Sequence, residues 1–249
     1  MTKMTDGLID LVIPVYNEAH VLEDSVGRLR AAMERDADFP WRIVVVDNGS
    51  NDGTGDVGRQ LEKNLDRFLY IHLDQKGRGR ALTKAWTETD AQFSLYMDVD
   101  LSTGLDAVPK VVDQLRAGAD VVTGSRLDRD ARVTRCFKRE VLSRGYNLLI
   151  RGIMWTKSFD DAQCGFKAVR LESVRPLLPL IQNKNWFFDT ELLVLAEYAS
   201  LTVKTVPVEW VEDTDTRVNI PNTVWEDLKG LARLRRTARR DVRQWKQSQ

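Results

Sequence analysis

The stretch AQFSLYMDVDLST, residues 91–103, ends a run of mostly apolar side chains with two carboxylates. Residues 91–97 are largely aromatic and aliphatic, which predicts a buried strand. Asp98 and Asp100 then fall at the carboxyl end of that strand. Because open α/β sheets bind their ligands at this end of the strands, the stretch predicts an α/β fold with two acidic side chains at its ligand-binding edge.

Further strands and helices are predicted around this stretch. Apolar, β-branched runs alternate with segments of helical periodicity, such as the spacing of Leu22, Val26, Leu29 and Met33. We expect strands at residues 8–16, 41–47, 68–73, 91–97 and 121–124, and helices at 22–33, at 54–65 and after the run KGRGRAL at 76–82. Strands separated by helices imply a mostly parallel sheet with helices on both faces.

Beyond Arg126 the alternation is less regular. We expect an amphipathic helix at residues 139–154, a short strand at 163–170, a helix at 189–199 and an edge strand at 202–210 that contains Pro207. No internal repeat or low-complexity linker interrupts the chain. The pattern predicts one domain over residues 1–220, followed by a basic amphipathic C-terminal helix over 221–249.

Composition limits the classes of protein that the chain can represent. Its 249 residues are 43% hydrophobic and carry no formal net charge, which suits a globular core. No run of about 18 apolar residues is present, and the start MTKMTDGLID lacks the features of a signal peptide, so a cytoplasmic location is expected. Cys136 and Cys164 have no CxxC spacing and no nearby histidine, which predicts reduced thiols.

Four predicted strand ends carry polar or flexible segments: VYNE at 15–18, VDNGSNDGT at 46–54, QKGRGRA at 75–81 and DVD at 98–100. In a parallel sheet these segments share one edge. Acidic side chains there suit a metal ion, and glycines allow the backbone to approach a ligand closely. Lys76, Arg78 and Arg80 suit phosphate. Alone, each segment is more simply explained as a turn, a helix cap or a solvated loop. Their coincidence favours a site for a nucleotide diphosphate with a divalent cation. No GxGxxG follows the first strand, which disfavours a dehydrogenase.

The order and spacing of seven segments resemble the family 2 glycosyltransferases with a GT-A fold. More narrowly, the chain resembles the dolichyl- and polyprenyl-phosphate glycosyltransferases, especially their β-glucosyl branch, over residues 8–220. The segments are IPVYNE, VVDNGSNDGT, QKGRGRAL, YMDVDLST, VVTGSRL, DAQCGFKAVR, and WFFDTELLVLAE with VKTVPVEWVEDTDTRV. The resemblance implies an inverting, metal-dependent transfer of a hexose or N-acetylhexosamine from a UDP-sugar to polyprenyl phosphate.

The resemblance also implies roles for residues at matching positions. Asp98 and Asp100 match the pair that binds Mg²⁺ or Mn²⁺ between the donor phosphates. The positions that hold the nucleoside and the diphosphate are matched by Pro14, Tyr16, Glu18, Asp47, Asn48, Lys76, Gly77 and Gly79.

Four further positions concern the acceptor and the sugar. Arg126 matches an arginine that holds the acceptor phosphate, with Arg139, Arg144 and Arg217 as weaker candidates. Asp189 matches the base of sugar-acceptor relatives; here it would contact the donor sugar or orient groups, or it would only cap the following helix. Gln163 would contact the sugar or hydrogen-bond its own loop.

Two departures from the family pattern bear on the donor. Asn48 replaces a second aspartate of many relatives, and it can still accept a hydrogen bond from a base. Ser102 replaces the glutamine of mannosyl-transferring relatives, which favours the glucosyl branch. Two alternatives remain: a GDP-mannose-dependent mannosyltransferase, and an inactive partner that binds nucleotide-sugars.

The C-terminal segment has one helical apolar stripe and many basic residues. Eight lysines and arginines and one acid lie between Lys229 and Lys246, and Arg235 interrupts the stripe. The stripe consists of Val224, Leu228, Leu231, Ala238, Val242 and Trp245. It would either lie on the cytoplasmic face of a membrane or pack on the domain, and a separate small membrane protein would help to recruit the chain. Residues 1–228 hold 29 basic and 36 acidic residues and so carry a net negative charge. This charge and the lack of a nucleic-acid recognition motif disfavour nucleic-acid binding.

Overall fold

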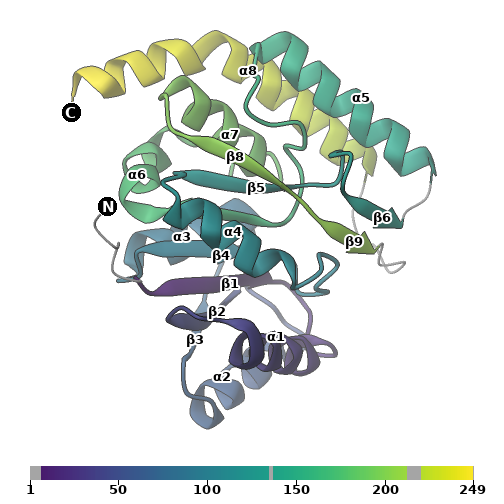
Figure 1. Cartoon of the computed structure of the whole chain (residues 1–249), viewed down its shortest axis with the longest axis vertical. Coiled ribbons are helices and arrows are strands. Elements are labelled where there is room, and N and C mark those ends of the chain that lie inside the picture. The colour runs from purple at the N-terminus through teal and green to yellow at the C-terminus, as the bar shows by residue number, and fades with distance from the viewer. Residues whose placement is uncertain (1–6, 135–136, 212–219, 249) are drawn as a thin grey trace.

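The computed structural model describes residues 7–134, 137–211 and 220–248 (Figure 1). The first half comprises β1 (Ile9–Val15), α1 (Leu22–Asp36), β2 (Trp41–Asp47), α2 (Thr54–Asn64), β3 (Phe68–His72), α3 (Arg78–Glu88), β4 (Phe93–Tyr96), α4 (Ala107–Arg116) and β5 (Val121–Ser125). The second half comprises β6 (Arg132–Thr134), α5 (Phe137–Met154), β7 (Lys167–Arg170), α6 (Leu171–Val174), η1 (Arg175–Leu180), α7 (Phe188–Tyr198), β8 (Val203–Pro207), β9 (Glu209–Val211) and α8 (Ile220–Gln247).

The main sheet has seven strands in the order β3-β2-β1-β4-β7-β5-β8. Every neighbouring pair is parallel except those of β7, which runs antiparallel to both β4 and β5. The prediction of a mostly parallel sheet is confirmed. The predicted edge strand at residues 202–210 is confirmed for β8, which ends at Pro207, whereas residues 209–211 pair with β6 in a separate ribbon.

The register brings the ends of the first four strands to one edge of the sheet. Val15 pairs with Asp47 and Asp47 with His72, while Val12 of β1 pairs with Tyr96 of β4. Since these strands are parallel, the segments that follow them all leave the sheet on the same side. We call this side the carboxyl edge, and it is where the sequence predicted ligand-binding groups to meet.

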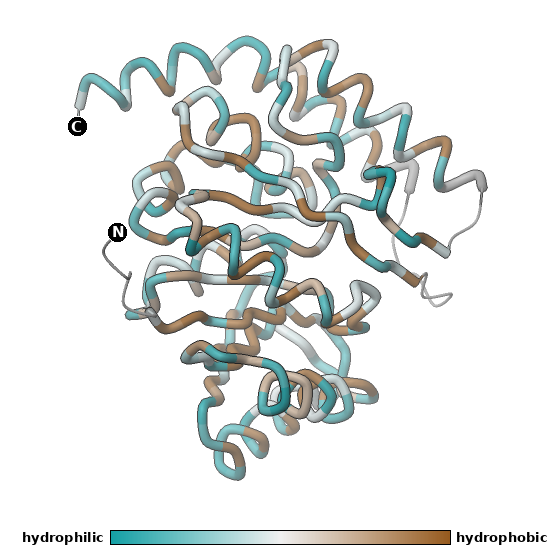
Figure 2. Tube along the Cα trace, viewed as in Figure 1, coloured by the Kyte–Doolittle hydropathy of each residue, from teal (hydrophilic) through white to brown (hydrophobic). Residues whose placement is uncertain are grey.

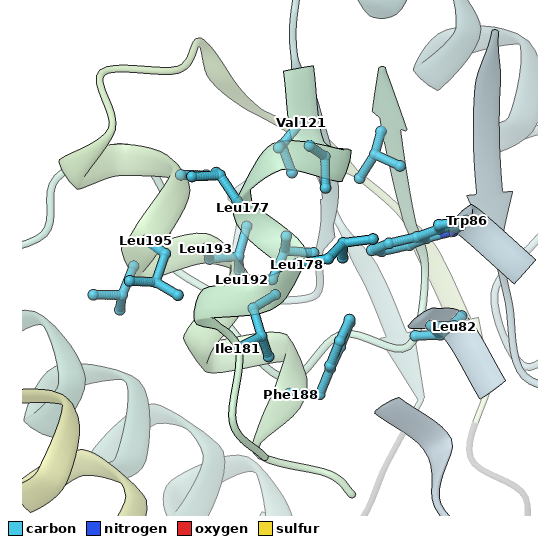
Figure 3. Packing of buried hydrophobic residues seen from close by; sticks show 14 of the residues in the cluster. Leu82, Trp86, Val121, Leu177, Leu178, Ile181, Phe188, Leu192, Leu193 and Leu195 are labelled. Carbon is cyan, nitrogen blue, oxygen red and sulfur yellow. The ribbon is translucent and has the colours of Figure 1, made fainter. Parts of the chain in front are cut away.

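Helices cover both faces of the sheet because its strands alternate their apolar side chains between two cores. Val44 and Val46 of β2 belong to a first core, together with residues of α3, α5, α7 and α8. Ile43 and Val45 belong to a second core, together with residues of α1 and α4. Figure 3 shows part of the first core, in which the rings of Trp86 and Phe188 lie 5.7 Å apart. Figure 2 shows apolar residues along the strands of the sheet.

Three elements differ from the prediction. Helix α3 starts at Arg78, inside the run KGRGRAL rather than after it, so Gly79 and Arg80 are helical. The segment 163–170 forms strand only at β7 (Lys167–Arg170). Helix α4 was not predicted; its Pro109 lies in the first turn, where a missing N–H costs no hydrogen bond.

The predicted C-terminal helix is present as α8, and most of its apolar stripe is buried. Leu231, Ala238 and Val242 belong to the first core, together with Leu234. Of the two alternatives for this stripe, the structure shows packing on the domain, and these three side chains cannot also face a bilayer. In the described part of the chain no helix is both long and apolar enough to cross a membrane.

Candidate active site

The loops that follow β1 and β2 are joined by hydrogen bonds. Asn17, whose φ of 57° is left-handed, donates its backbone N–H to Ser50 Oγ at 2.9 Å and accepts from the backbone of Asn51 at 2.9 Å. The backbone N–H of Glu18 donates to Thr54 Oγ1 at 2.9 Å. The structure thus brings the sequence-predicted residues Tyr16 and Glu18 beside Asp47 and Asn48, while Pro14 lies in β1 next to Val46.

Asp47 and Asn48 are buried at the end of β2. Asp47 accepts hydrogen bonds from the backbone of Ser50 at 2.9 Å and from the hydroxyl of Tyr70 at 2.7 Å. Burial opposes its charge, but these hydrogen bonds hold the pKa of Asp47 below its usual value. Asn48 Nδ2 donates to the carbonyl of Val15 at 3.1 Å, and no donor among the described residues reaches Asn48 Oδ1. This edge therefore offers a carboxylate and an amide oxygen that can accept hydrogen bonds.

The loop before α3 reaches the same edge. The ammonium of Lys76 lies 3.9 Å from the ring centroid of Tyr16. Gly77 has a φ of 151°, and a Cβ there would lie 2.5 Å from the carbonyl oxygen of Lys184. A Cβ at Gly79 would lie 2.7 Å from the side chain of Phe188. Close packing against the segment before α7 and against α7 itself is thus a structural reason for both glycines.

Asp98 and Asp100 follow β4 at the centre of the carboxyl edge. The side chain of Asp98 is 38% exposed and accepts a hydrogen bond from Arg78 Nη1. Asp100 is exposed and accepts from the backbone N–H of Ser102 at 2.9 Å. The carboxylate of Asp98 packs closely against Gly165, where a Cβ would lie 1.9 Å from Asp98 Oδ2. Two oxygen-bearing side chains therefore reach the surface at one point.

Arg78 is the cation that joins the parts of this site, and the sequence indicated it only as one of three phosphate-binding candidates. Its side chain is buried, with the guanidinium carbon 5.1 Å from the Trp186 ring centroid and 5.2 Å from that of Tyr96. Besides its bond to Asp98, its Nε lies 3.8 Å from Asp189 Oδ2. Within the described residues its Nε and Nη2 have no hydrogen-bond partner. Both nitrogen atoms are buried, so Arg78 contributes mainly positive charge to this site.

Asp189 is buried on the interior side of Arg78, and its side chain does not cap a helix. It is the second residue of α7, its carboxylate accepts a hydrogen bond from the hydroxyl of Tyr96, and its Oδ1 lies 3.6 Å from Lys167 Nζ. Burial raises the pKa of Asp189 to about 7, against the influence of Arg78. Burial lowers the pKa of Lys167 to about 8. The N-cap alternative for Asp189 is therefore wrong, because the side chain points into the interior.

The raised pKa of Asp189 predicts a pH dependence of stability. A carboxyl whose pKa rises on folding stabilises the native state fully below its unfolded value, near 4, and this contribution is lost as the pH rises to the folded value near 7. Between pH 5 and pH 8 we expect the free energy of unfolding to fall by about 2 kcal/mol more in the wild type than in Asp189→Asn. Urea unfolding at four pH values measures this difference, and parallel curves would show that Asp189 is already ionised at pH 5.

The arginine predicted for the acceptor phosphate has a partner within the protein. Arg126 donates from Nε and Nη2 to the buried carboxylate of Asp161 at 2.7 and 2.9 Å, and its guanidinium carbon lies 5.5 Å from the ring centroid of Trp210. Burial opposes its charge, but Asp161, with a smaller contribution from Asp98, raises the pKa of Arg126. Arg126 thus lies close enough to the carboxyl edge to sense Asp98.

The other predicted residues are more dispersed. Gln163 Nε2 donates to Asp227 Oδ2 of α8 at 2.8 Å, a partner outside its own loop that neither alternative for this residue named. Arg144 pairs with Glu140 one turn away on α5. Arg217 and the side chain of Arg139 lie outside the described part of the structure.

Four contributing residues carried no predicted role: Asp161, Lys167 and Asp227, and Arg78 as the link between carboxylates. The first two lie in the segment DAQCGFK, where charged residues flank small and apolar ones. That pattern is a usable signal that both charged residues, Asp161 and Lys167, are buried. Asp227 gave no such signal, because an acid among the charges of α8 looks like part of a solvated face.

Comparison with solved structures identifies the fold. The crystal structure of glucosyl-3-phosphoglycerate synthase from Mycobacterium tuberculosis, in complex with Mn²⁺, UDP-glucose and phosphoglyceric acid, matches 92% of this chain and 79% of that one. The TM-score is 0.69 and the sequence identity 16%. The sheet, its carboxyl edge and the helices on both faces are those of a GT-A glycosyltransferase.

The chain belongs to glycosyl transferase family 2, whose model matches residues 10–177. Among curated relatives, glycosyltransferase AglD of Haloferax volcanii is 34% identical over 218 residues, which are 85% of this chain and 34% of that protein. The dolichyl-phosphate beta-glucosyltransferase of Dictyostelium discoideum is 26% identical over 243 residues, which are 91% of this chain and 73% of that one. The chain thus spans about a third of the first relative and about three quarters of the second.

Proposed function

We propose that the chain is an inverting transferase that moves a hexose or N-acetylhexosamine from a UDP-sugar to polyprenyl phosphate, using a divalent cation. The observation that carries the proposal is the placement of Asp98 and Asp100 at the carboxyl edge, beside Arg78 and next to the buried pair Asp47 and Asn48. A diphosphate fits between the carboxylates and the basic groups. A nucleoside fits against the loops that follow β1 and β2.

The carboxylate pair fits a divalent cation. Both side chains offer oxygen ligands, which Mg²⁺ and Mn²⁺ prefer, and both reach the carboxyl edge of the sheet. The described residues contain no cluster of three or more metal-binding side chains, so donor phosphates and water would complete the coordination. A cation held there would supply Lewis-acid stabilisation of the charge that develops on the leaving diphosphate. The Mn²⁺ in the mycobacterial complex supports a metal in this fold without deciding between the two ions.

The residues of this chain would act mainly by positioning. In the reaction the bond between the anomeric carbon and the diphosphate oxygen breaks, its electron pair leaves with UDP, and an acceptor phosphate oxygen bonds to that carbon. The acceptor oxygen is already anionic at neutral pH, so no general base is required. Arg78 would stabilise the negative charge of the diphosphate through its own positive charge, and Arg126 would attract the acceptor phosphate. Asp189 would hold Arg78 in place from the interior of the domain.

The relatives support the choice of acceptor. Several of them are named dolichyl-phosphate beta-glucosyltransferases, and Ser102 favours the same branch over GDP-mannose as donor. A lipid acceptor implies work at a membrane surface, and we propose the cytoplasmic face, with a separate small membrane protein as a further partner. The division into a catalytic domain over residues 1–220 and a C-terminal segment over 221–249 is part of the same proposal.

A second candidate is a partner protein that binds nucleotide-sugars without transferring them. The observation in its favour is the bond between Arg78 and Asp98, which engages one carboxylate oxygen of the pair that would bind the metal. In an active enzyme this bond must rearrange when the donor enters with its cation.

Transfer of radiolabelled sugar from UDP-glucose, UDP-N-acetylglucosamine or GDP-mannose to a short polyprenyl phosphate in detergent tests the proposal, with Mg²⁺ or Mn²⁺ present. We expect one UDP-sugar to react and chelation by EDTA to abolish the transfer. Transfer from GDP-mannose alone would replace the UDP donor by the mannosyl alternative. Donor binding without transfer, measured by calorimetry on the same protein, would favour the inactive partner.

A further inference from the structure

The outward face of α5 is apolar, although a surface helix normally presents polar residues to water. Val141, Leu142, Leu148 and Leu149 are exposed on α5, and Leu148 is 72% exposed. Trp155, directly after the helix, is 69% exposed. The opposite side of α5 is buried in the first core through Ile150 and Met154, so this helix is apolar on both sides. The helix predicted at 139–154 is confirmed as α5, but its exposed side carries apolar residues as well as Arg144 and Arg151.

Two glycines make this face flat and open. Gly145 and Gly152 fall at helical spacing with Val141 and Leu148, so these four residues share one stripe. A Cβ placed at either glycine would meet no atom of the described structure within 4 Å. Because glycine inside a helix costs about 1 kcal/mol relative to alanine, this composition is unfavourable for an isolated solvated helix.

The first turns of α8 extend this surface. Val224, Trp225 and Leu228 are exposed there, and Trp225 is 58% exposed. Helices α5 and α8 contact each other and lie side by side on one side of the molecule (Figure 1). Both pack their inner sides into the same core cluster, so their outer sides face away from the domain together. We call the exposed apolar side chains of α5, Trp155 and the first turns of α8 the α5–α8 face.

The α5–α8 face adjoins the candidate active site. Asp227, next to Leu228 on α8, accepts the hydrogen bond from Gln163 at 2.8 Å, and Gln163 lies two residues from Gly165 beside Asp98. On the other side Tyr146 of α5 lies near Asp227, which contributes to raising the pKa of the tyrosine hydroxyl. A surface that binds this face therefore lies near the carboxylate proposed to bind the cation.

We propose that the α5–α8 face docks on the headgroup region of a bilayer that contains anionic lipids. The charges around the face favour this occupant: Arg144 and Lys229 pair with Glu140 and Glu226, and Arg151 is exposed beside them, which leaves one positive charge in excess. Further along α8 the outer side carries basic residues without apolar ones: Arg235, Arg236, Arg239, Arg243 and Lys246. Exposed leucines bordered by tryptophan and arginine suit the membrane–water interface.

This proposal rests on the proposed function, because a polyprenyl phosphate acceptor is presented at the surface of a bilayer. Of the stripe predicted from the sequence, only Val224 and Leu228 belong to this face, and the other four residues are buried or partly buried. The docking surface lies on α5 and the start of α8, and the distal half of α8 contributes only electrostatic attraction.

Binding to lipid vesicles, without donor or acceptor, tests the proposal separately from transfer. The full chain is sedimented with vesicles of phosphatidylcholine and phosphatidylglycerol at about 3:1. The test variant is Leu142→Glu with Leu148→Glu, and the matched control is Gln244→Glu with Gln247→Glu, which makes the same charge change on the distal part of α8. All four side chains are exposed, so both variants are expected to fold and to bind UDP as the wild type does.

We expect the leucine variant to bind the vesicles at least about tenfold more weakly than the glutamine variant, which loses only part of the electrostatic attraction. Equal losses in both variants would show that net charge alone drives binding and would overturn the α5–α8 face as the docking surface. Failure of the wild type to bind would overturn it as well. A wild-type dimer that the leucine variant converts to a monomer, measured by light scattering, would assign the face to a second copy instead. Transfer in detergent remains measurable in every case, so the proposed function stands or falls independently.

Discussion

Replacing Asp100 by asparagine is expected to lower the rate of sugar transfer about a thousandfold, which corresponds to about 4 kcal/mol of transition-state stabilisation. The physical reason is the small number of ligands that the chain provides. Asp98 and Asp100 are the two carboxylates that reach this point, and Asp98 already shares its charge with Arg78. Asparagine keeps the size and the hydrogen bond from Ser102 but removes the negative charge.

The control for this change is Asp106→Asn. Asp106 lies shortly after Asp100, is similarly exposed, and pairs with Lys110 at 2.7 Å, so its replacement removes the same charge from the same region. We expect less than a twofold effect on transfer from it. Binding of Mn²⁺ to each variant, followed by electron paramagnetic resonance in the presence of UDP, gives a readout besides activity. An Asp100→Asn protein that keeps its rate within tenfold of the wild type would contradict a role for this carboxylate in holding the cation.

Replacing Arg78 by methionine is expected to reduce the free energy of unfolding by about 3 kcal/mol. The guanidinium is buried between Asp98 and the buried Asp189, so methionine fills the volume but leaves the inner carboxylate with less compensating charge. Asp98 is partly solvated, so the loss is attributed mainly to Asp189. We also expect transfer to fall at least about a hundredfold, since the variant loses the positive charge beside Asp98 at the proposed diphosphate site.

The neighbouring Arg80 gives the matched comparison. It lies on the same first turn of α3, and its Nη1 donates to the carbonyl of Lys76 at 2.5 Å. Arg80→Met is expected to change stability by less than about 1 kcal/mol. Urea unfolding and the transfer assay are applied to both variants and to Arg78→Lys, which keeps the charge but not the planar donor geometry. If Arg78→Lys transferred at the wild-type rate, a single positive charge would be sufficient. Equal stability of Arg78→Met and Arg80→Met would contradict the central place of Arg78.

The strands and helices that build the carboxyl edge could be predicted because their signals are local. The apolar run that ends in Asp98 and the spacing of Leu22, Val26, Leu29 and Met33 are visible within short windows of sequence. Parallel pairing then requires successive strand ends to meet at one edge. The start of α3 at Arg78 could not be predicted in the same way, because packing of Gly79 against Phe188 makes a helical turn favourable in a segment that reads as a loop.

The partners of charged side chains could not be read from the sequence. Arg126 was assigned to a ligand, yet its nearest carboxylate is Asp161, which the chain brings back through the loop before β7. Asp189 read as a possible cap, yet it lies inside the domain beside Lys167. Burial, which only the complete fold defines, decides whether such a charge is solvated or paired.

The sequence by itself determined the α/β class, the family and the pair of carboxylates after β4, because strand periodicity and motif order are properties of the chain. The tertiary structure alone decided that Arg78 lies between Asp98 and Asp189, and that α5 rather than the distal part of α8 presents the exposed apolar surface. Both helices carry apolar residues on more than one side. Which side is buried depends on the shape of the core onto which it packs, and that shape is set by segments far apart in the sequence.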